Sequence, residues 1–309
     1  MEKKKLVIDV GGTRIKYATI SDDLTLSEVT SVATDLSGLD GYMAQLESIY
    51  REVEKEVDGI AMSVPGVLDH KTGFMKSGGN LTFIKDMPFS QELSKQLGKV
   101  RVTIENDAKA AGYAELVYGA LQNVNNGVVC VLGTGIGGCT IVDRKIVRGF
   151  NNFAGEYSYL ITPELPIGDI TTDDNFVGYS NGIGALFSSY EKYMELPADS
   201  VDGYTFFEAA NTGDKTALRV LRSYCRSLVL SLVNIQTVID PEVIAIGGGI
   251  SVQPLVLETI QEEYRKFISI DKLSVIGMRS VPEIVVCKFN NEANLIGAYC
   301  NFRELYPID

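Results

Sequence analysis

Two short segments place glycines and a hydroxyl side chain directly after an apolar run, a pattern typical of anion-binding turns. The first is Asp9-Val-Gly-Gly-Thr13, and the second is Gly133-Thr-Gly135. Successive backbone N–H groups in such turns form a concave site for phosphate. Asp9 could hold Mg²⁺ beside it, usually through water. Either turn alone could be an ordinary tight hairpin, but the pair favours a site for a polyphosphate.

A third segment, Glu105-Asn106-Asp107, follows an apolar run and opens a segment that we expect to be helical. The carboxyl ends of strands are where α/β sheets place their ligands. A carboxylate at that place can accept the proton of a hydroxyl group. Asp107 could also serve only as the N-cap of the helix, because an aspartate there satisfies free N–H groups.

Several other kinds of site are disfavoured by the sequence. The single histidine, His70, lies in a turn-like run where we expect it to be solvated, and it leaves little room for histidine-based catalysis. Gly178-Tyr-Ser-Asn-Gly182 matches a nucleophile elbow, but that triad requires a histidine after the serine. The glycines of 133–138 precede a β-branched segment and not a helix, which argues against a Rossmann dinucleotide turn.

Composition sets wider limits. The chain has 309 residues, 45% of them hydrophobic and 22% charged, as expected for about two globular domains. Its net charge of −12 argues against nucleic acid as a partner. No apolar run is long enough for a membrane span, so we expect no membrane association. The five cysteines form no C-x-x-C pair, which favours a reducing, cytoplasmic location.

Strands are expected to alternate with helices along the chain, which predicts an α/β fold with largely parallel sheets. A strand, a glycine turn and a second strand occur around Gly11 and again around Gly133, so two similar halves are expected. The expected strands are 5–10, 14–20, 59–64, 100–104, 127–132, 139–142, 145–147, 243–246 and 284–287, and the expected helices are 39–57, 89–97, 107–121, 183–194, 214–238, 254–267 and 292–304.

In their order and spacing, the motifs resemble those of the ROK family (repressors, open reading frames and sugar kinases), within the actin-like sugar kinase superfamily. The resemblance covers nearly the whole chain. It rests on Ile8-Asp-Val-Gly-Gly-Thr13, Ser63-Val-Pro-Gly66, Asn80-Leu, Glu105-Asn-Asp-Ala-Lys-Ala-Ala111, Leu132-Gly-Thr-Gly-Ile-Gly-Gly138, Arg148-Gly through Phe153-Ala-Gly-Glu156, and Ile244-Ala-Ile-Gly-Gly-Gly249.

The resemblance implies two actin-like (ribonuclease H-like) α/β domains that flank a cleft. A smaller N-terminal domain would span 1–120 and a larger C-terminal domain 121–290. A C-terminal helix in 291–309 would pack back on the first domain. The family also implies a homodimer.

The resemblance further implies a glucokinase-like enzyme that uses ATP and Mg²⁺ to phosphorylate a hexose hydroxyl, at the 6-position. Such a transfer asks mainly for positioning and charge neutralisation, so it needs no histidine. The implied roles are the following: Asp107 is the general base; Asn80, Asn106 and Glu156 bind sugar hydroxyls; Gly11, Gly12, Thr13, Gly133, Thr134 and Gly135 hold phosphates; Gly247, Gly248 and Gly249 approach the nucleotide; and Asp9 helps to hold Mg²⁺, through water.

One departure from the family affects the substrate. Family members carry a histidine where this chain has Tyr159, and a cysteine cluster for zinc, but no cysteine lies between Cys139 and Cys225. No zinc is therefore expected. Tyr159 could supply a phenol hydroxyl to the sugar, leave room for a substituent, or only fill space. Lys109 replaces a usual asparagine, and we expect it to point to solvent.

Several activities remain open at this point. Glucose is the leading substrate, and a β-glucoside is the second because the altered site lies near O1 of the sugar. N-acetylmannosamine and fructose are further candidates. A sugar-binding sensor without catalysis is the alternative of another class. A repressor is disfavoured, because the first strand begins by about residue 5 and leaves no space for a helix-turn-helix.

Overall fold

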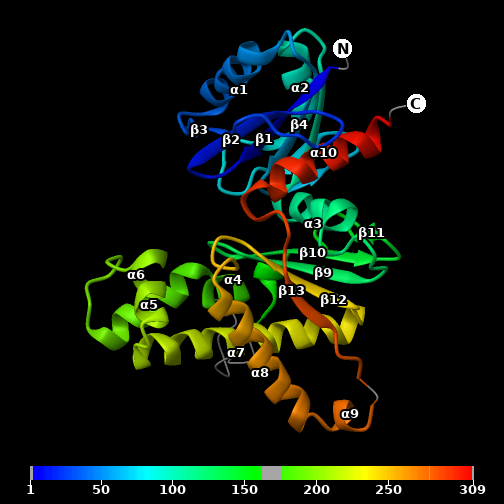
Figure 1. Ribbon diagram of the computed structural model, residues 1–309. Helices are drawn as coiled ribbons and strands as arrows, with labels where there is room; N and C mark the ends of the chain where they lie inside the picture. The colour runs from blue at the N-terminus through cyan, green and yellow to red at the C-terminus, as the bar shows by residue number, and fades with distance from the viewer. Residues whose placement is uncertain (1–2, 162–175, 278, 308–309) are drawn as a thin grey trace. The chain divides into compact units, whose positions relative to one another are not determined.

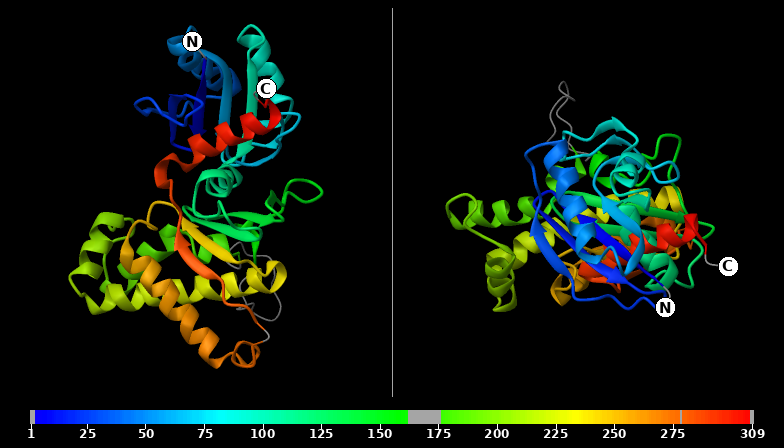
Figure 2. Two further views of the ribbon diagram at one scale, coloured as in Figure 1. Left: turned by 45° about the vertical axis from the view of Figure 1, so that its right-hand side comes forward. Right: turned by 90° about the horizontal axis from the view of Figure 1, so that it is seen from above.

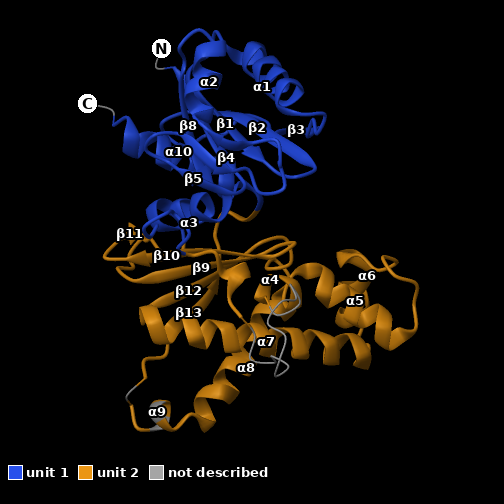
Figure 3. Cartoon of the chain, turned by 180° about the vertical axis from the view of Figure 1, so that it is seen from behind, with its two compact units in different colours: residues 1–119, 148–154, 291–309 blue, residues 120–147, 155–290 orange. Residues whose placement is uncertain are grey.

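The computed structural model describes residues 3–161, 176–277 and 279–307, which form two compact α/β units (Figures 1 and 3). Unit 1 consists of Met1–Gly119, Arg148–Ala154 and Asn291–Asp309, and unit 2 of Ala120–Val147 and Gly155–Asn290. The α/β class expected from the sequence is confirmed. None of the helices in the described ranges combines the length and the apolar character that a membrane crossing requires.

Unit 1 is built on a five-stranded sheet of order β3-β2-β1-β4-β8. Strand β1 pairs antiparallel with β2 but parallel with β4, and β4 pairs parallel with β8. The carboxyl ends of β1, β4 and β8 therefore meet at one edge of the sheet. The strands are β1 (Lys4–Val10), β2 (Arg14–Ile20), β3 (Thr30–Ala33), β4 (Val57–Val64) and β8 (Arg101–Asn106).

Helices cover both faces of this sheet (Figures 1 and 2). Leu6 and Ile8 belong to the core cluster that includes the apolar side of α1 (Leu39–Val53), whereas Val7 belongs to the cluster under α10 (Ala293–Leu305). Alternate side chains of a strand point to opposite faces, so α1 and α10 lie on opposite faces. Helices α2 (Phe89–Gln96) and α3 (Asp107–Tyr118) complete the unit.

A small antiparallel sheet follows β4, made of β5 (Val67–Asp69), β6 (Phe74–Ser77) and β7 (Lys85–Met87). Gly66 directly precedes this sheet, and its φ of 100° lies in the left-handed region that favours glycine. A Cβ atom at this position would lie 2.1 Å from the carbonyl oxygen of Ser77. Gly66 therefore allows the backbone of β6 to come close to the end of β4.

Unit 2 repeats the topology of unit 1. Its five-stranded sheet has the order β11-β10-β9-β12-β13, with β9 antiparallel to β10 but parallel to β12, and β12 parallel to β13. The repeat expected from the two glycine turns is thus present as a repeat of strand order. The strands are β9 (Gly127–Leu132), β10 (Ile136–Val142), β11 (Lys145–Ile146), β12 (Val243–Gly247) and β13 (Glu283–Val286).

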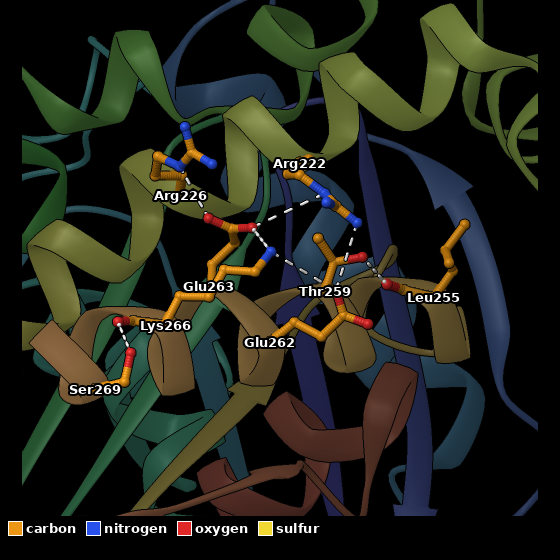
Figure 4. A network of polar contacts seen from close by, with 8 residues as sticks. All are labelled: Arg222, Arg226, Leu255, Thr259, Glu262, Glu263, Lys266 and Ser269. Atoms are coloured by element: carbon orange, nitrogen blue, oxygen red, sulfur yellow. Dashed lines mark hydrogen bonds and ion pairs between the residues drawn. The ribbon is translucent and has the colours of Figure 1, made fainter.

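Two long helices of unit 2, α7 (Lys215–Ile239) and α8 (Pro254–Ile270), pack against each other. Between them lies the carboxylate of Glu263, which is 4% exposed and accepts from Arg226 at 2.8 Å and from Lys266 at 2.7 Å (Figure 4). Among the described residues, the other helices of unit 2 are η1 (Tyr157–Tyr159), α4 (Val177–Ser180), α5 (Ile183–Met194), α6 (Gly203–Asn211) and α9 (Lys272–Val275). The short helix η3 (Asn290–Glu292) lies where the chain passes back to unit 1.

Candidate active site

The carboxyl-end edge of the unit 1 sheet gathers polar side chains from three neighbouring strands. Asp9 of β1 is in register with Ser63 of β4, and Ser63 is in register with Glu105 of β8. Glu105 is directly followed by Asn106 and Asp107. This edge therefore brings the predicted Mg²⁺ ligand onto the same side of the sheet as the predicted base.

Asp9 is set in a partly buried site. Burial raises the pKa of its carboxyl group, whereas the Asn294 side chain, which donates to it at 2.9 Å, and the charge of Lys16 act in the opposite direction. A cation beside Asp9 would offset the cost of burying the carboxylate. No cluster of three or more histidine, cysteine or acidic side chains that could hold a metal occurs among the described residues. The carboxylate of Asp9 is an oxygen ligand of the kind that Mg²⁺ prefers, and it fits an ion held chiefly by water and phosphate oxygens.

The first glycine turn joins β1 to β2. The N–H of Gly11 donates to the carbonyl of Arg14 at 2.9 Å, and the hydroxyl of Thr34 donates to the carbonyl of Gly11 at 2.8 Å. A Cβ atom on Gly12 would lie 3.7 Å from the amide nitrogen of Asn80. Asn80 is exposed, as is Thr13. The turn predicted to hold phosphate thus lies beside a residue predicted to bind sugar.

Helix α3 begins at Asp107, but its N-cap is Asn106. The side-chain oxygen of Asn106 accepts from the N–H of Lys109 at 3.1 Å, and its amide donates to the carbonyl of Gly66 at 3.1 Å. The alternative that Asp107 is only the N-cap is therefore wrong. These contacts use one N–H and one lone pair of the Asn106 side chain, whose amide nitrogen and oxygen can each make two hydrogen bonds.

The carboxylate of Asp107 is partly exposed, and its Oδ1 accepts from the N–H of Ala108 at 2.8 Å. This contact fixes the direction of one oxygen relative to the helix. The side chain of Lys109, in contrast, is only 2% exposed. The expectation that Lys109 points to solvent is thus wrong, since α3 buries that side of its first turn.

The second glycine turn lies in unit 2, between β9 and β10. The N–H of Gly133 donates to the carbonyl of Gly135 at 3.0 Å, and the N–H of Ile183 donates to the carbonyl of Gly133 at 2.9 Å. A Cβ on Gly182 would lie 2.1 Å from the carbonyl oxygen of Thr134. The first residues of α5 therefore pack directly against the backbone of this turn.

The loop Gly247-Gly248-Gly249 follows β12 and lies against the same edge of the unit 2 sheet. Gly248 has a φ of 94°, and a Cβ on it would lie 2.0 Å from the carbonyl oxygen of Leu132, just before Gly133. The two sets of glycines predicted to contact the nucleotide thus lie side by side. Gly249 has open space around its Cα, with nothing within 4 Å of a Cβ.

Glu156 and Tyr159 also belong to unit 2, at the short helix η1. The N–H of Tyr159 donates to the carbonyl of Glu156 at 3.1 Å. Tyr159 is 55% exposed, and its ring meets the ring of Phe176 edge-on, with 5.7 Å between centroids. The Tyr159 ring therefore has one aromatic neighbour in Phe176 but stays accessible to solvent.

The sequence profile of the ROK family matches residues 5–304. This chain belongs to the ROK family. The family predicted from the motifs is confirmed, and with it the actin-like α/β fold. The chain is an ATP-dependent sugar kinase, since sugar kinases of the family match it over almost its full length.

Two curated relatives and one solved structure illustrate the similarity of this ROK kinase to known proteins. A β-glucoside kinase of Klebsiella pneumoniae is 27% identical over 98% of this chain and 97% of its own. A glucokinase of Streptomyces coelicolor is 23% identical over 97% of this chain and 98% of its own. A ROK family protein of Streptococcus pneumoniae TIGR4, solved in complex with sucrose, has a TM-score of 0.83 and 29% identity, covering 97% of this chain and 98% of that one.

Other side chains of this ROK kinase join the site without a local signal in the sequence. Asn294 reaches Asp9 from a helix at the other end of the chain. Ser158 supports the second turn, since its hydroxyl accepts from the N–H of Ile136 at 2.9 Å. Glu105 and Arg148 form an ion pair at 2.6 Å beside the predicted base. Both stand in the ROK motifs, but the motifs alone assign them no role.

Proposed function

We propose that this ROK kinase transfers the γ-phosphoryl group of ATP to the 6-hydroxyl of a hexose, with Asp107 as general base. The observation that carries the proposal is the place of Asp107. It starts a helix at the carboxyl-end edge of parallel strands, partly exposed and with one oxygen oriented by the N–H of Ala108. The phosphate turn at Gly11–Thr13 and the exposed Asn80 belong to the same unit.

In the proposed reaction, the carboxylate of Asp107 accepts the proton of the sugar hydroxyl. The hydroxyl oxygen forms a bond to the γ-phosphorus while the bond to the β–γ bridging oxygen breaks, and ADP leaves with that electron pair. Asn80 and Asn106 orient the hydroxyls of the sugar. Mg²⁺ near Asp9 neutralises charge on the phosphates when it is bound.

The nucleotide is assigned to the glycines of both units. Gly12 and Thr13 in unit 1, and Thr134 and Gly135 in unit 2, are assigned to offer backbone N–H groups to phosphate oxygens. Gly11 and Gly133 are assigned to the same two sites, where their N–H groups close the turns by donating to the carbonyls of Arg14 and Gly135. Gly247, Gly248 and Gly249 are assigned to the adenosine side. The close approach of Gly248 to Leu132 supports this assignment, because it sets the two glycine segments of unit 2 next to each other.

Glucose is the proposed substrate, and a β-glucoside is the second candidate. The second candidate is favoured by Tyr159, which is exposed and held from the side by Phe176. Glu156 and Tyr159 would contact the sugar near O1, where a substituent would lie. The relatives named above include kinases for both substrates. We also propose a homodimer in the cytoplasm, consistent with five cysteines that are buried thiols.

The test is release of ADP from MgATP with glucose, fructose, mannose, N-acetylmannosamine, N-acetylglucosamine and cellobiose. One sugar should stimulate release, and Asp107→Asn should lower kcat by about 100- to 10,000-fold. Asp86→Asn is the matched control, because it makes the same change at an exposed position of unit 1 where φ is 47° and asparagine is tolerated. Sugar binding by calorimetry without ADP release would instead identify a sensor.

A further inference from the structure

Glu105 is a fully buried carboxylate, 0% exposed, in strand β8 and two residues before the proposed base. Its Oε1 accepts from Nη1 of Arg148 at 2.9 Å and from the backbone N–H of Asn106 at 2.9 Å. Its Oε2 accepts from Nη2 of Arg148 at 2.6 Å. This is a two-pronged arginine–carboxylate pair, a geometry that fixes both partners in direction as well as in distance.

Arg148 opens a short strap, Arg148–Ala154, that belongs to unit 1, although residues on both sides of it belong to unit 2. The N–H of Ala154 donates to the carbonyl of Arg148 at 3.1 Å, which closes the strap into a loop. Phe150 is fully exposed and gives the strap no anchor of its own. The side chain of Arg148, 16% exposed, ties the strap to β8 through its ion pair with Glu105.

The contacts continue from Glu105 to the base. Glu105 accepts a hydrogen bond from the backbone N–H of Asn106. The side chain of Asn106 is fixed as well, because it donates to the carbonyl of Gly66 and accepts from the N–H of Lys109. The backbone direction of Asn106 determines where Asp107 enters α3. Every step of this chain of contacts lies within unit 1.

We propose that Arg148 and Glu105 are positioning residues of this kinase, which hold Asp107 in the direction that proton acceptance requires. The inference rests on the proposed role of Asp107 as base. Neither residue touches the reacting atoms in this scheme. Because a base displaced by about 1 Å loses about 100-fold in rate, the pair acts on the chemical step and not on the affinity for substrate.

Arg148→Met removes both prongs while keeping an unbranched side chain. We expect kcat to fall by about 10- to 100-fold. The KM values for sugar and for ATP should stay within about threefold, since the Asn106 side chain keeps its own hydrogen bonds to the carbonyl of Gly66 and the N–H of Lys109. Arg148→Lys keeps the positive charge, but its ammonium group cannot bind the carboxylate in the bidentate way of a guanidinium. Its kcat should therefore lie between those of Arg148→Met and the unmodified protein. Arg101→Met, an exposed arginine at the other end of β8, is the matched control and should leave kcat unchanged.

Glu105→Gln and the double variant with Arg148→Met test whether the two side chains act as one unit. Effects of residues that act together do not add, so the double variant should lose no more than the worse single variant. Losses that multiply would overturn the pair as a unit. Unchanged kcat in Arg148→Met, or a loss confined to the KM for sugar, would overturn the positioning role.

The strap offers a second readout that does not depend on turnover. The chain contains no tryptophan, and Phe150 is fully exposed, so Phe150→Trp introduces one fluorophore on the strap. Adding Arg148→Met should lower its fluorescence anisotropy, while adding Arg101→Met should not. Equal anisotropy in all three proteins would show that Arg148 does not hold the strap.

The failure of this inference differs from a failure of the proposed function. If Asp107→Asn is inactive but Arg148→Met is fully active, the base assignment stands and the positioning pair is wrong. If Asp107→Asn retains activity, the proposed base is wrong and the pair has no base to position. Thermal unfolding of each variant separates both outcomes from a loss of folded protein.

Discussion

At the scale of single residues, the histidine was expected in a solvated turn, and the structure corrects this. His70 is 6% exposed, and its Nδ1 has no hydrogen-bond partner among the described residues. It follows β5, in the small sheet that packs beside β8. The heptapeptide from Val67 to Gly73 reads as a polar turn in isolation, and only the neighbouring chain buries it.

This burial predicts how His70 titrates. Burial, and next the charge of Arg148, lower its pKa below the usual value of about 6.5, whereas the carboxylates of Glu105, Glu304 and Asp69 act in the opposite direction. The only histidine signal in an NMR titration should therefore have a midpoint below about 6.5, and Arg148→Met should raise it. A midpoint at or above about 6.5 would contradict the burial of His70.

The same shift has a consequence for stability. Because the folded state has the lower pKa, the unfolded state binds the extra proton first as the pH falls. The free energy of unfolding should therefore be constant near neutral pH and decrease as the pH falls through about 6.5. Denaturant unfolding at several pH values should show this decrease, and His70→Gln, which cannot titrate, should show less of it.

At the scale of elements, the long periodic segments were predictable. The expected strand 14–20 is β2, and the expected helix 183–194 is α5, each with the same bounds. Strand β3 was missed because it lies at the sheet edge and is mostly exposed, so it shows no alternation of apolar residues. Helix α6 was missed because it is short and starts with Gly203.

At the candidate site, too, local sequence patterns predict some residues and miss others. The residues at strand ends, Asp9 and Glu105–Asp107, follow from local pattern alone. Their supporting contacts do not, since Arg148 and Asn294 lie far from them in the sequence. Such pairs depend on tertiary packing that no local periodicity reports.

One element contact makes a strong prediction about stability. Helix α10 packs on α3 at Gly297, where a Cβ would lie 1.7 Å from the carbonyl oxygen of Ala110. Gly297→Ala should therefore force the helices apart and lower the free energy of unfolding by about 1–3 kcal/mol. Gly184→Ala in α5 is the control, because a Cβ there meets nothing within 4 Å; it should be neutral or stabilise by about 0.5–1 kcal/mol. Equal stabilities in urea unfolding would contradict the close packing.

At the scale of the whole molecule, each unit has a hydrophobic core of its own, one around Leu6 and Ile8 and the other around Val128 and Ile244. The proposed sugar and nucleotide groups are also divided between the units. The proposed base, Asn80 and Asn106 lie in unit 1, whereas Glu156, Tyr159 and the Gly247–Gly249 loop lie in unit 2. A change at one unit's site should therefore leave the other unit's ligand contacts intact.

Gly248→Ala tests this independence. Its φ of 94° and the 2.0 Å approach to the carbonyl of Leu132 leave no room for a methyl group, so the loop must move away from the second glycine turn. A ligand at 100 times its Kd stabilises the folded state by about 2.7 kcal/mol. In thermal unfolding, the variant should lose most of the stabilisation given by a non-hydrolysable ATP analogue but keep that given by the sugar. Gly184→Ala should keep both. Loss of both in Gly248→Ala, with unchanged stability of the free protein, would mean that the sugar contacts depend on the nucleotide loop and that the two sites are not independent.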